Sequence, residues 1–177
     1  MISTIFLIAT QTTEKIFARV GAEPDFSFSF DFLFKILLAI GAGLLIGIER
    51  EYKGKDAGLK TNMLVAVGSC VFVFLSIQFQ GGEFFDPTRV LSQVVTGIGF
   101  LGAGVIIKKG ANVQGLTTAA TVWCSAAAGC MAAFYLVTDL LLFTCTVVFV
   151  NLIFGYIGKK MAGNESSYSP KDSDNEN

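Results

Sequence analysis

The sequence predicts an all-α membrane protein, a polytopic bundle of five transmembrane helices preceded by an N-terminal interfacial helix. Three observations lead to this fold class. Of the 177 residues, 53% are hydrophobic and only 15% are charged, which is too apolar for an ordinary soluble domain. Five stretches reach the length of about 17 to 25 apolar residues that crosses a bilayer. No Asp or Glu occurs from 87 to 138, and a water-facing domain would rarely lack acids over such a length.

The first element is the segment 1–31. Its apolar residues recur at helical spacing, but a polar stretch from Gln11 to Lys15 interrupts the first apolar run. We therefore expect an amphipathic helix that lies in the membrane interface rather than a sixth span. A secretory signal peptide is the weaker alternative, because the segment lacks a basic n-region and a clean small-residue cleavage site.

The five spans follow in a transmembrane domain over 32–160. They are expected at about 32–48, 63–79, 90–107, 116–137 and 138–158. Asp86 and Pro87 have the residue types of an N-cap and first helical position for the third span. Only Thr138 and Asp139 separate the last two spans, so that boundary is soft. The segment 161–177 is polar and acidic, and we expect a disordered tail there.

The positions of the basic residues indicate the orientation. With five spans and the N-terminus outside, nine of the thirteen Lys and Arg residues fall in the inner segments. This distribution follows the positive-inside rule and places the C-terminus in the cytoplasm.

Composition also excludes several classes of function. The chain has no histidine, which removes imidazole catalysis and His-ligated metal sites. A net charge of −1 provides no basic surface for nucleic acid. The four cysteines lie in apolar runs without CxxC spacing and are expected to be small buried hydrophobes.

Glycines on the spans predict close helix packing. On the first span two glycines share a face with Ala39, a small-xxx-small pattern that also makes a dimer plausible. On the third span glycines occupy two roughly opposite faces, so we expect this helix to be the central one. The same stretch matches the dinucleotide pattern GxGxxG, but no acid follows about 20 residues later to hold a ribose, so packing is the preferred interpretation. The expected packing glycines are Gly43, Gly47, Gly97, Gly99, Gly102 and Gly104.

Polar side chains also occur at membrane depth. The fourth span carries a stripe of hydroxyl and small residues on one face, with Trp123 on the opposite face. The stripe is expected to point inward, either as a narrow polar path or ligand site or, more commonly, as hydrogen-bonding groups that hold helices together. The intramembrane polar candidates are Gln93, Thr117, Thr118, Thr121 and Asn151.

Charged residues gather at the inner end of the first span. Glu49 sits at a helix C-terminus, where a carboxylate opposes the helix dipole. Either it pairs with a nearby cation such as Lys53, as Glu51 would with Lys55, or it meets a cation or a partner. No span has an acid near its centre, which argues against a cation-coupled carrier. The inner-mouth candidates are Glu49, Arg50, Thr61 and Asn62.

Four ordered blocks closely resemble the MgtC/SapB family of bacterial inner-membrane proteins. They are 47–51 (GIERE), 57–65 (AGLKTNMLV), 97–106 (GIGFLGAGVI) and 115–123 (GLTTAATVW). The resemblance runs from about 33 to 160. Longer members carry a soluble C-terminal domain after the fifth span, whereas here only 162–177 follow, as in the SapB-like branch.

The resemblance implies a multi-pass plasma-membrane protein tied to Mg²⁺ limitation and, in pathogens, to survival inside host phagocytes. We expect a non-enzymatic regulator or accessory of Mg²⁺ homeostasis; the alternative is a small oligomeric channel or transporter for Mg²⁺ or monovalent cations. The expected partners are membrane lipid and a second copy of the chain. The resemblance implies a further protein partner, either a P-type Mg²⁺ ATPase or the F-type ATP synthase. No catalytic residue or cofactor is expected, and Mg²⁺ stays open as a ligand.

Overall fold

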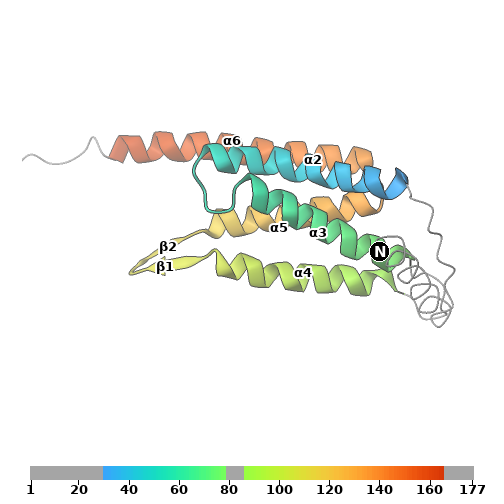
Figure 1. The fold of residues 1–177 in the computed structure, drawn as a ribbon. Helices are drawn as coiled ribbons and strands as arrows, with labels where there is room; N and C mark the ends of the chain where they lie inside the picture. The colour runs from blue at the N-terminus through green and yellow to red at the C-terminus, as the bar shows by residue number, and fades with distance from the viewer. Residues whose placement is uncertain (1–29, 79–85, 166–177) are drawn as a thin grey trace, which may run out of the picture.

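The computed structural model describes residues 30–78 and 86–165. The expected interfacial helix and most of the expected tail lie outside these residues. The described elements are α2 (Phe30–Tyr52), α3 (Leu59–Gln78), α4 (Pro87–Gly104), β1 (Ile107–Lys109), β2 (Asn112–Gln114), α5 (Leu116–Ala133) and α6 (Val137–Glu165). Figure 1 shows the helices side by side in one bundle, with the β1–β2 hairpin projecting from one end. The prediction of an all-α membrane bundle is confirmed.

Four helices of the described part are long and apolar enough to cross a membrane: α2, α3, α5 and the 137–157 portion of α6. The expected span at 90–107 corresponds to α4, which falls outside this group. Its helix begins with Pro87-Thr88-Arg89 and ends at Gly104. The apolar residues after Gly104 therefore lead into the hairpin instead of lengthening the helix. Among the long helices of the described part, α4 is therefore the one that is not apolar enough to qualify as a span.

A short hairpin, which was not expected from the sequence, connects α4 to α5. The strands β1 and β2 pair antiparallel, with Lys108 opposite Val113. Gly110 begins the two-residue turn at a φ of 62°, a conformation that favours glycine. Gly115 follows the hairpin at a φ of 89°, and a Cβ there would collide with the carbonyl oxygen of Val105. Two glycines therefore set the path of this connection.

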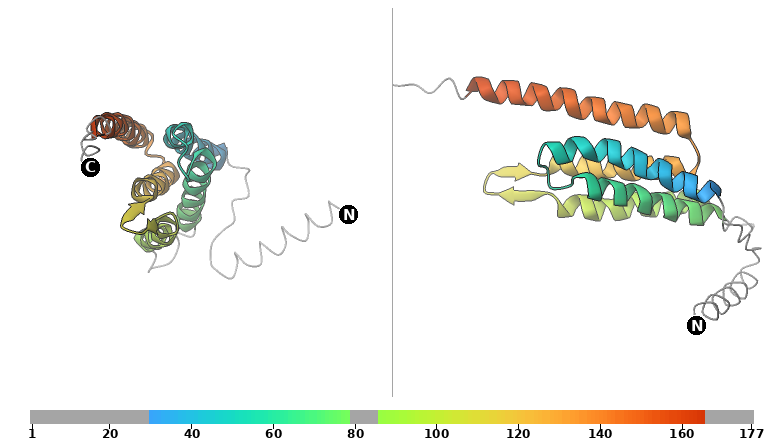
Figure 2. Two further views of the ribbon diagram at one scale, coloured as in Figure 1. Left: turned by 90° about the vertical axis from the view of Figure 1, so that its left-hand side faces the viewer. Right: turned by 45° about the horizontal axis from the view of Figure 1, so that its top comes forward.

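The central position belongs to α5. It packs against α2, α3, α4 and α6 (Figure 2). By contrast, α4 lies at one edge of the bundle, where it packs against α3 and α5. At another edge lies α6, which packs against α2 and α5. The prediction that the third span is central is therefore wrong. The physical reason is the small-residue surface of α5: Gly129 lies so close to α3 that a Cβ would collide with the carbonyl group of Ala66.

The ends of the helices carry recognisable signals. Asp86 caps α4 as predicted: its carboxylate accepts hydrogen bonds from Thr88 N at 2.9 Å and Thr88 Oγ1 at 2.6 Å. These bonds, led by the one from the hydroxyl, lower the pKa of Asp86 below its ordinary value. The boundary between α5 and α6 falls a few residues before the predicted one, at Tyr135, which has a φ of 62°. Helix α6 continues to Glu165, so helical backbone extends into the segment expected as a tail.

We call the end of the bundle that carries the hairpin and the α2–α3 loop (53–58) the hairpin end. The C-terminus of α2 and the N-termini of α3 and α5 all meet there (Figure 1). Most of the candidate polar residues lie at this end.

Candidate functional site

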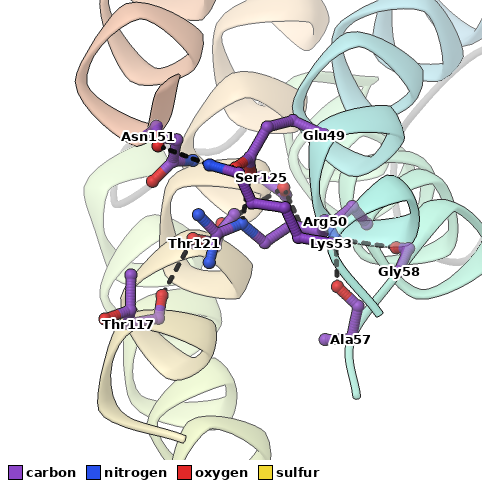
Figure 3. Close-up of polar contacts among 10 residues, drawn as sticks. Glu49, Arg50, Lys53, Ala57, Gly58, Thr117, Thr121, Ser125 and Asn151 are labelled. Carbon is purple, nitrogen blue, oxygen red and sulfur yellow. Dashed lines mark hydrogen bonds and ion pairs between the residues drawn. The ribbon is translucent and has the colours of Figure 1, made fainter. Parts of the chain in front are cut away.

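Three charged residues at the C-terminus of α2 form a buried charge cluster, defined as Glu49, Arg50 and Lys53 (Figure 3). Glu49 is 6% exposed and Arg50 is 3% exposed. Arg50 Nε donates to Glu49 Oε2 at 2.6 Å, and the Lys53 ammonium, one helical turn later, pairs with Glu49 Oε1. Of the two alternatives for Glu49, the structure favours pairing with neighbouring cations, and the carboxylate is shared between two of them.

Lys53 extends the cluster to α6. Its Nζ donates to the backbone oxygen of Asn151 at 3.0 Å. A Cβ at Gly155, one turn further along α6, would collide with the same Nζ, so the glycine leaves room for the ammonium group. Lys53 therefore joins the C-terminus of α2 to α6. The sequence offered a signal for Lys53, its spacing from Glu49, but none for Gly155.

Asn62 forms a second connection, between α3 and α5. It is completely buried, and its Nδ2 donates to Ala57 O at 3.0 Å and to Gly58 O at 2.7 Å. Its Oδ1 accepts a hydrogen bond from Ser125 Oγ of α5 at 2.7 Å. Both ends of the amide are thus used, one to fix the loop before α3 and the other to fix α5. By contrast, Thr61 is exposed and does not join this group.

The packing glycines of α2 bring this region together. A Cβ at Gly43 would approach Asn62 O and Met63 Cα to 2.7 Å, and a Cβ at Gly47 would approach Leu59 Cα to 2.8 Å. The two backbones therefore need these glycines for their close approach. Beside them, Glu51 accepts a hydrogen bond from Leu59 N at 2.9 Å, so it caps the start of α3 instead of pairing with Lys55.

The inward side of the hydroxyl stripe on α5 is packed and hydrogen-bonded. Thr118, Thr121 and Ser125 are buried, whereas Thr117 is exposed. Thr121 Oγ1 donates to Thr117 O at 2.8 Å, and Ser125 Oγ also lies 3.2 Å from Thr121 O. Hydroxyls that bond to the preceding turn, and to Asn62, support the interpretation that the stripe holds helices together.

The remaining candidates lie on α4. Gln93 is exposed and lines a groove of about 500 Å³ between α3 and α4, with Ser69, Phe72 and Gly97 among its other walls. The groove residues do not include Thr121, so the two are not part of one lining. A Cβ at Gly102 would meet Ala119 Cβ at 3.7 Å, an ordinary contact. Nothing in the described residues comes within 4 Å of the Cβ positions of Gly97, Gly99 and Gly104.

Two side chains of the cluster region, Asn151 and Arg50, have N–H groups without an acceptor among the described residues. The Nδ2 of Asn151 is buried without a hydrogen-bond partner among the described residues. Arg50 makes one side-chain hydrogen bond within the described chain, from Nε, and its terminal nitrogens make none. The region therefore contains more donors than acceptors and, with Arg50 and Lys53 against Glu49, one more positive than negative charge.

The MgtC family model matches residues 36–160. Protein MgtC of Brucella abortus (strain 2308) is 50% identical over 111 residues, which cover 63% of this chain and 46% of the relative. Protein MgtC of Salmonella typhimurium (strain LT2) is 49% identical over 100 residues, 56% of this chain and 42% of the relative. This chain thus spans about half the length of the curated relatives it matches, and no solved structure matches it. On the family match, the chain belongs to the MgtC family of multi-pass membrane proteins.

Proposed function

We propose that the protein is a non-enzymatic regulator or accessory of Mg²⁺ homeostasis, active when Mg²⁺ is scarce. The basis is its membership of the MgtC family, together with the way in which its buried polar groups are used. The relatives' names identify the family, and the role in Mg²⁺ homeostasis is the part that we propose for this chain.

The observation that carries the proposal is the pairing of Glu49. A Mg²⁺ route would use carboxylates and retained water, because this ion loses its hydration reluctantly. The buried carboxylate of this region is already shared by Arg50 and Lys53. Transferring it to a metal ion would leave buried cations unpaired, which costs several kcal/mol. The cluster is thus better suited to joining α2 to α6 than to conducting Mg²⁺.

Basic residues support a cytoplasmic position for the hairpin end. Lysines of the α2–α3 loop and of β1 lie there, and the positive-inside rule places such segments in the cytoplasm of a bacterial plasma (inner) membrane. The hairpin and this loop would then be the surfaces accessible to a cytoplasmic or membrane partner. A P-type Mg²⁺ ATPase and the F-type ATP synthase are the partners that the family resemblance suggests.

The alternative is a small oligomeric cation channel for Mg²⁺ or monovalent ions, and one observation supports the oligomer that it requires. The exposed side of α4 carries Ser92, Gln93 and Thr96, and α4 is the long helix that is too polar to count as a span. A second copy of the chain covering this side would remove these groups from lipid. An oligomer, of which a dimer is the simplest form, therefore fits both functions.

Complementation tests the regulator. A strain that lacks its own copy of the gene would be grown at limiting Mg²⁺ with the wild-type chain, with Glu49→Gln, or with Asp56→Asn, which alters an exposed acid of the neighbouring loop. We expect growth with the wild type and Asp56→Asn and a defect with Glu49→Gln at equal protein levels. Normal growth without the wild-type chain, or full rescue by Glu49→Gln, would remove the support for this function.

A further inference from the structure

The buried charge cluster has hydrogen-bond donors that nothing in the described chain satisfies. Arg50 uses only Nε, although a guanidinium carries five N–H groups. The Asn151 amide is buried and unpaired at Nδ2. In Figure 3 Asn151 lies beside the Lys53 ammonium, and that ammonium pairs with the same Glu49 carboxylate that Arg50 binds, so the three side chains belong to one connected cluster. An unpaired buried donor is costly, so the Asn151 Nδ2 needs an acceptor, and the free N–H groups of Arg50 can donate to the same one.

The charge of the region specifies the sign of that acceptor. Glu49 neutralises one of the two cations, which leaves one positive charge in a buried setting. Within the described chain, no other acid pairs with Arg50 or Lys53. A cation would therefore be repelled, whereas an anion would be attracted and would accept from several donors.

The geometry of the donors specifies the chemical class. A guanidinium presents two parallel N–H groups that match the spacing of oxygens in a phosphate or carboxylate, which a single-atom ion such as chloride cannot use. The Lys53 ammonium has a third N–H beyond its bonds to Glu49 and Asn151 O. Together with the Asn151 amide, these side chains offer enough donors for a group that has three or more oxygens.

The position of the region suggests how such a group would enter. Arg50 lies two residues before the end of α2, which places it near the level of lipid headgroups if α2 spans the membrane. The Lys53 side chain is 26% exposed, whereas those of Glu49 and Arg50 are nearly inaccessible. The side of the cluster at Lys53 is therefore the accessible one.

We propose that Arg50, Lys53 and Asn151 bind a phosphate-type oxyanion between α2, α5 and α6. The oxyanion is either a free phosphate or the phosphate of an anionic lipid headgroup, which share the same recognition chemistry. This inference rests on the proposed function for its physiological role, because occupancy would set how firmly α6 is held to α2. Binding itself can be measured independently of Mg²⁺ homeostasis.

The test uses the full chain, purified in an uncharged detergent without phosphate, at constant ionic strength. The probes are inorganic phosphate, dioctanoyl phosphatidic acid, and dioctanoylglycerol as the matched lipid without a phosphate. Binding is followed by the thermal unfolding midpoint, with the single tryptophan, Trp123, as the fluorophore, and lipid occupancy by native mass spectrometry. Stabilisation by inorganic phosphate identifies a soluble anion, and stabilisation by phosphatidic acid alone identifies a headgroup.

Two substitutions at Asn151 separate binding from folding. Asn151→Leu replaces the unpaired donor with a larger branched apolar side chain, and Asn151→Asp keeps the volume and places a carboxylate where the oxyanion would sit. The bond from Lys53 goes to the backbone oxygen of this residue, so neither variant deletes it. Without ligand, we expect both variants to have a thermal unfolding midpoint at or above that of the wild type. We expect both to bind the probe about tenfold more weakly, which is the loss of affinity expected when one or more charge-assisted hydrogen bonds are removed.

Lys60→Gln is the control for non-specific attraction, because Lys60 is an exposed cation at the same end of the bundle. It should bind the probe as the wild type does. The proposal is overturned if neither phosphate probe stabilises the wild type more than dioctanoylglycerol does, if both Asn151 variants bind normally, or if Lys60→Gln weakens binding as much as they do. A growth defect that occurs with normal binding would concern the proposed function alone.

Discussion

Replacing Glu49 with glutamine is the sharpest perturbation of the buried charge cluster. The substitution keeps the shape of the side chain and removes the one negative charge that Arg50 and Lys53 share. The glutamine oxygen can still accept from Arg50 Nε, but two cations are then left without a counter-charge. We therefore expect the bundle to lose stability even though almost no volume changes.

The magnitude follows from the burial of each partner. Breaking a buried ion pair by removing one partner costs about 3–5 kcal/mol, and Arg50 is buried enough for this range to apply. The retained hydrogen bond to Nε returns about 1 kcal/mol. Lys53 is partly exposed, so its lost pairing adds less than about 1 kcal/mol. The expected loss is about 3 kcal/mol in the free energy of unfolding.

The assay is equilibrium unfolding in mild detergent by increasing the fraction of a denaturing detergent, followed through Trp123 fluorescence. Asp56→Asn, an exposed acid in the adjacent loop, should stay within about 0.5 kcal/mol of the wild type. The double variant with Arg50→Gln should lose less than the sum of the two single variants, because it contains no unpaired buried arginine. A loss below about 0.5 kcal/mol for Glu49→Gln, or strict additivity with Arg50→Gln, would refute this reasoning.

Two further predictions concern helix packing and capping. Gly129→Ala should destabilise the bundle by about 1–3 kcal/mol, because the new methyl group would collide with the Ala66 backbone. The control is Gly68→Ala, whose Cβ position is open and which should be neutral or slightly stabilising in the same unfolding assay. Equal effects of the two substitutions would contradict the packing account. The hydrogen bonds from Thr88 depress the pKa of Asp86, so its contribution to stability is present above the ordinary Asp pKa and is lost as the pH falls through the lowered value. Amide exchange in the first turn of α4 should therefore speed up as the pH falls from about 5 to 2, beyond the intrinsic pH dependence, and this excess should be absent in Asp86→Asn.

Hydropathy and short-range spacing predicted much of the bundle. Apolar runs located the four helices that qualify as spans, and the four-residue spacing of Glu49 and Lys53 offered their ion pair as one of two alternatives. The inward face of α5 was also visible from the sequence, since Thr121 and Ser125 repeat at helical spacing and both are buried. These features depend on interactions within one helix or on the contrast between lipid and protein, and the local sequence encodes both.

Features that depend on which helices are neighbours were harder to predict. The glycines of α4 predicted a central helix, but a glycine permits close approach without specifying a partner. Gly129 of α5, by contrast, approaches a neighbouring backbone closely, that of Ala66. The bond from Ser125 to Asn62 joins residues far apart in the chain, so no local pattern contained it. The hairpin was missed because its apolar residues extended the hydropathy of the preceding span, and only Gly110 and Gly115 signalled the turn.

Ion flux through purified protein in liposomes tests the central claim most directly, namely that the buried polar groups hold the bundle together and do not conduct ions. Liposomes that contain a Mg²⁺ indicator, and a second set loaded for monovalent cations, would be compared with empty liposomes and with the Thr121→Leu and Gln93→Leu variants. The account predicts flux no greater than that of empty liposomes from a preparation whose gene restores growth at limiting Mg²⁺. Reproducible flux through the wild type that either variant abolishes would contradict the account and establish the channel in its place.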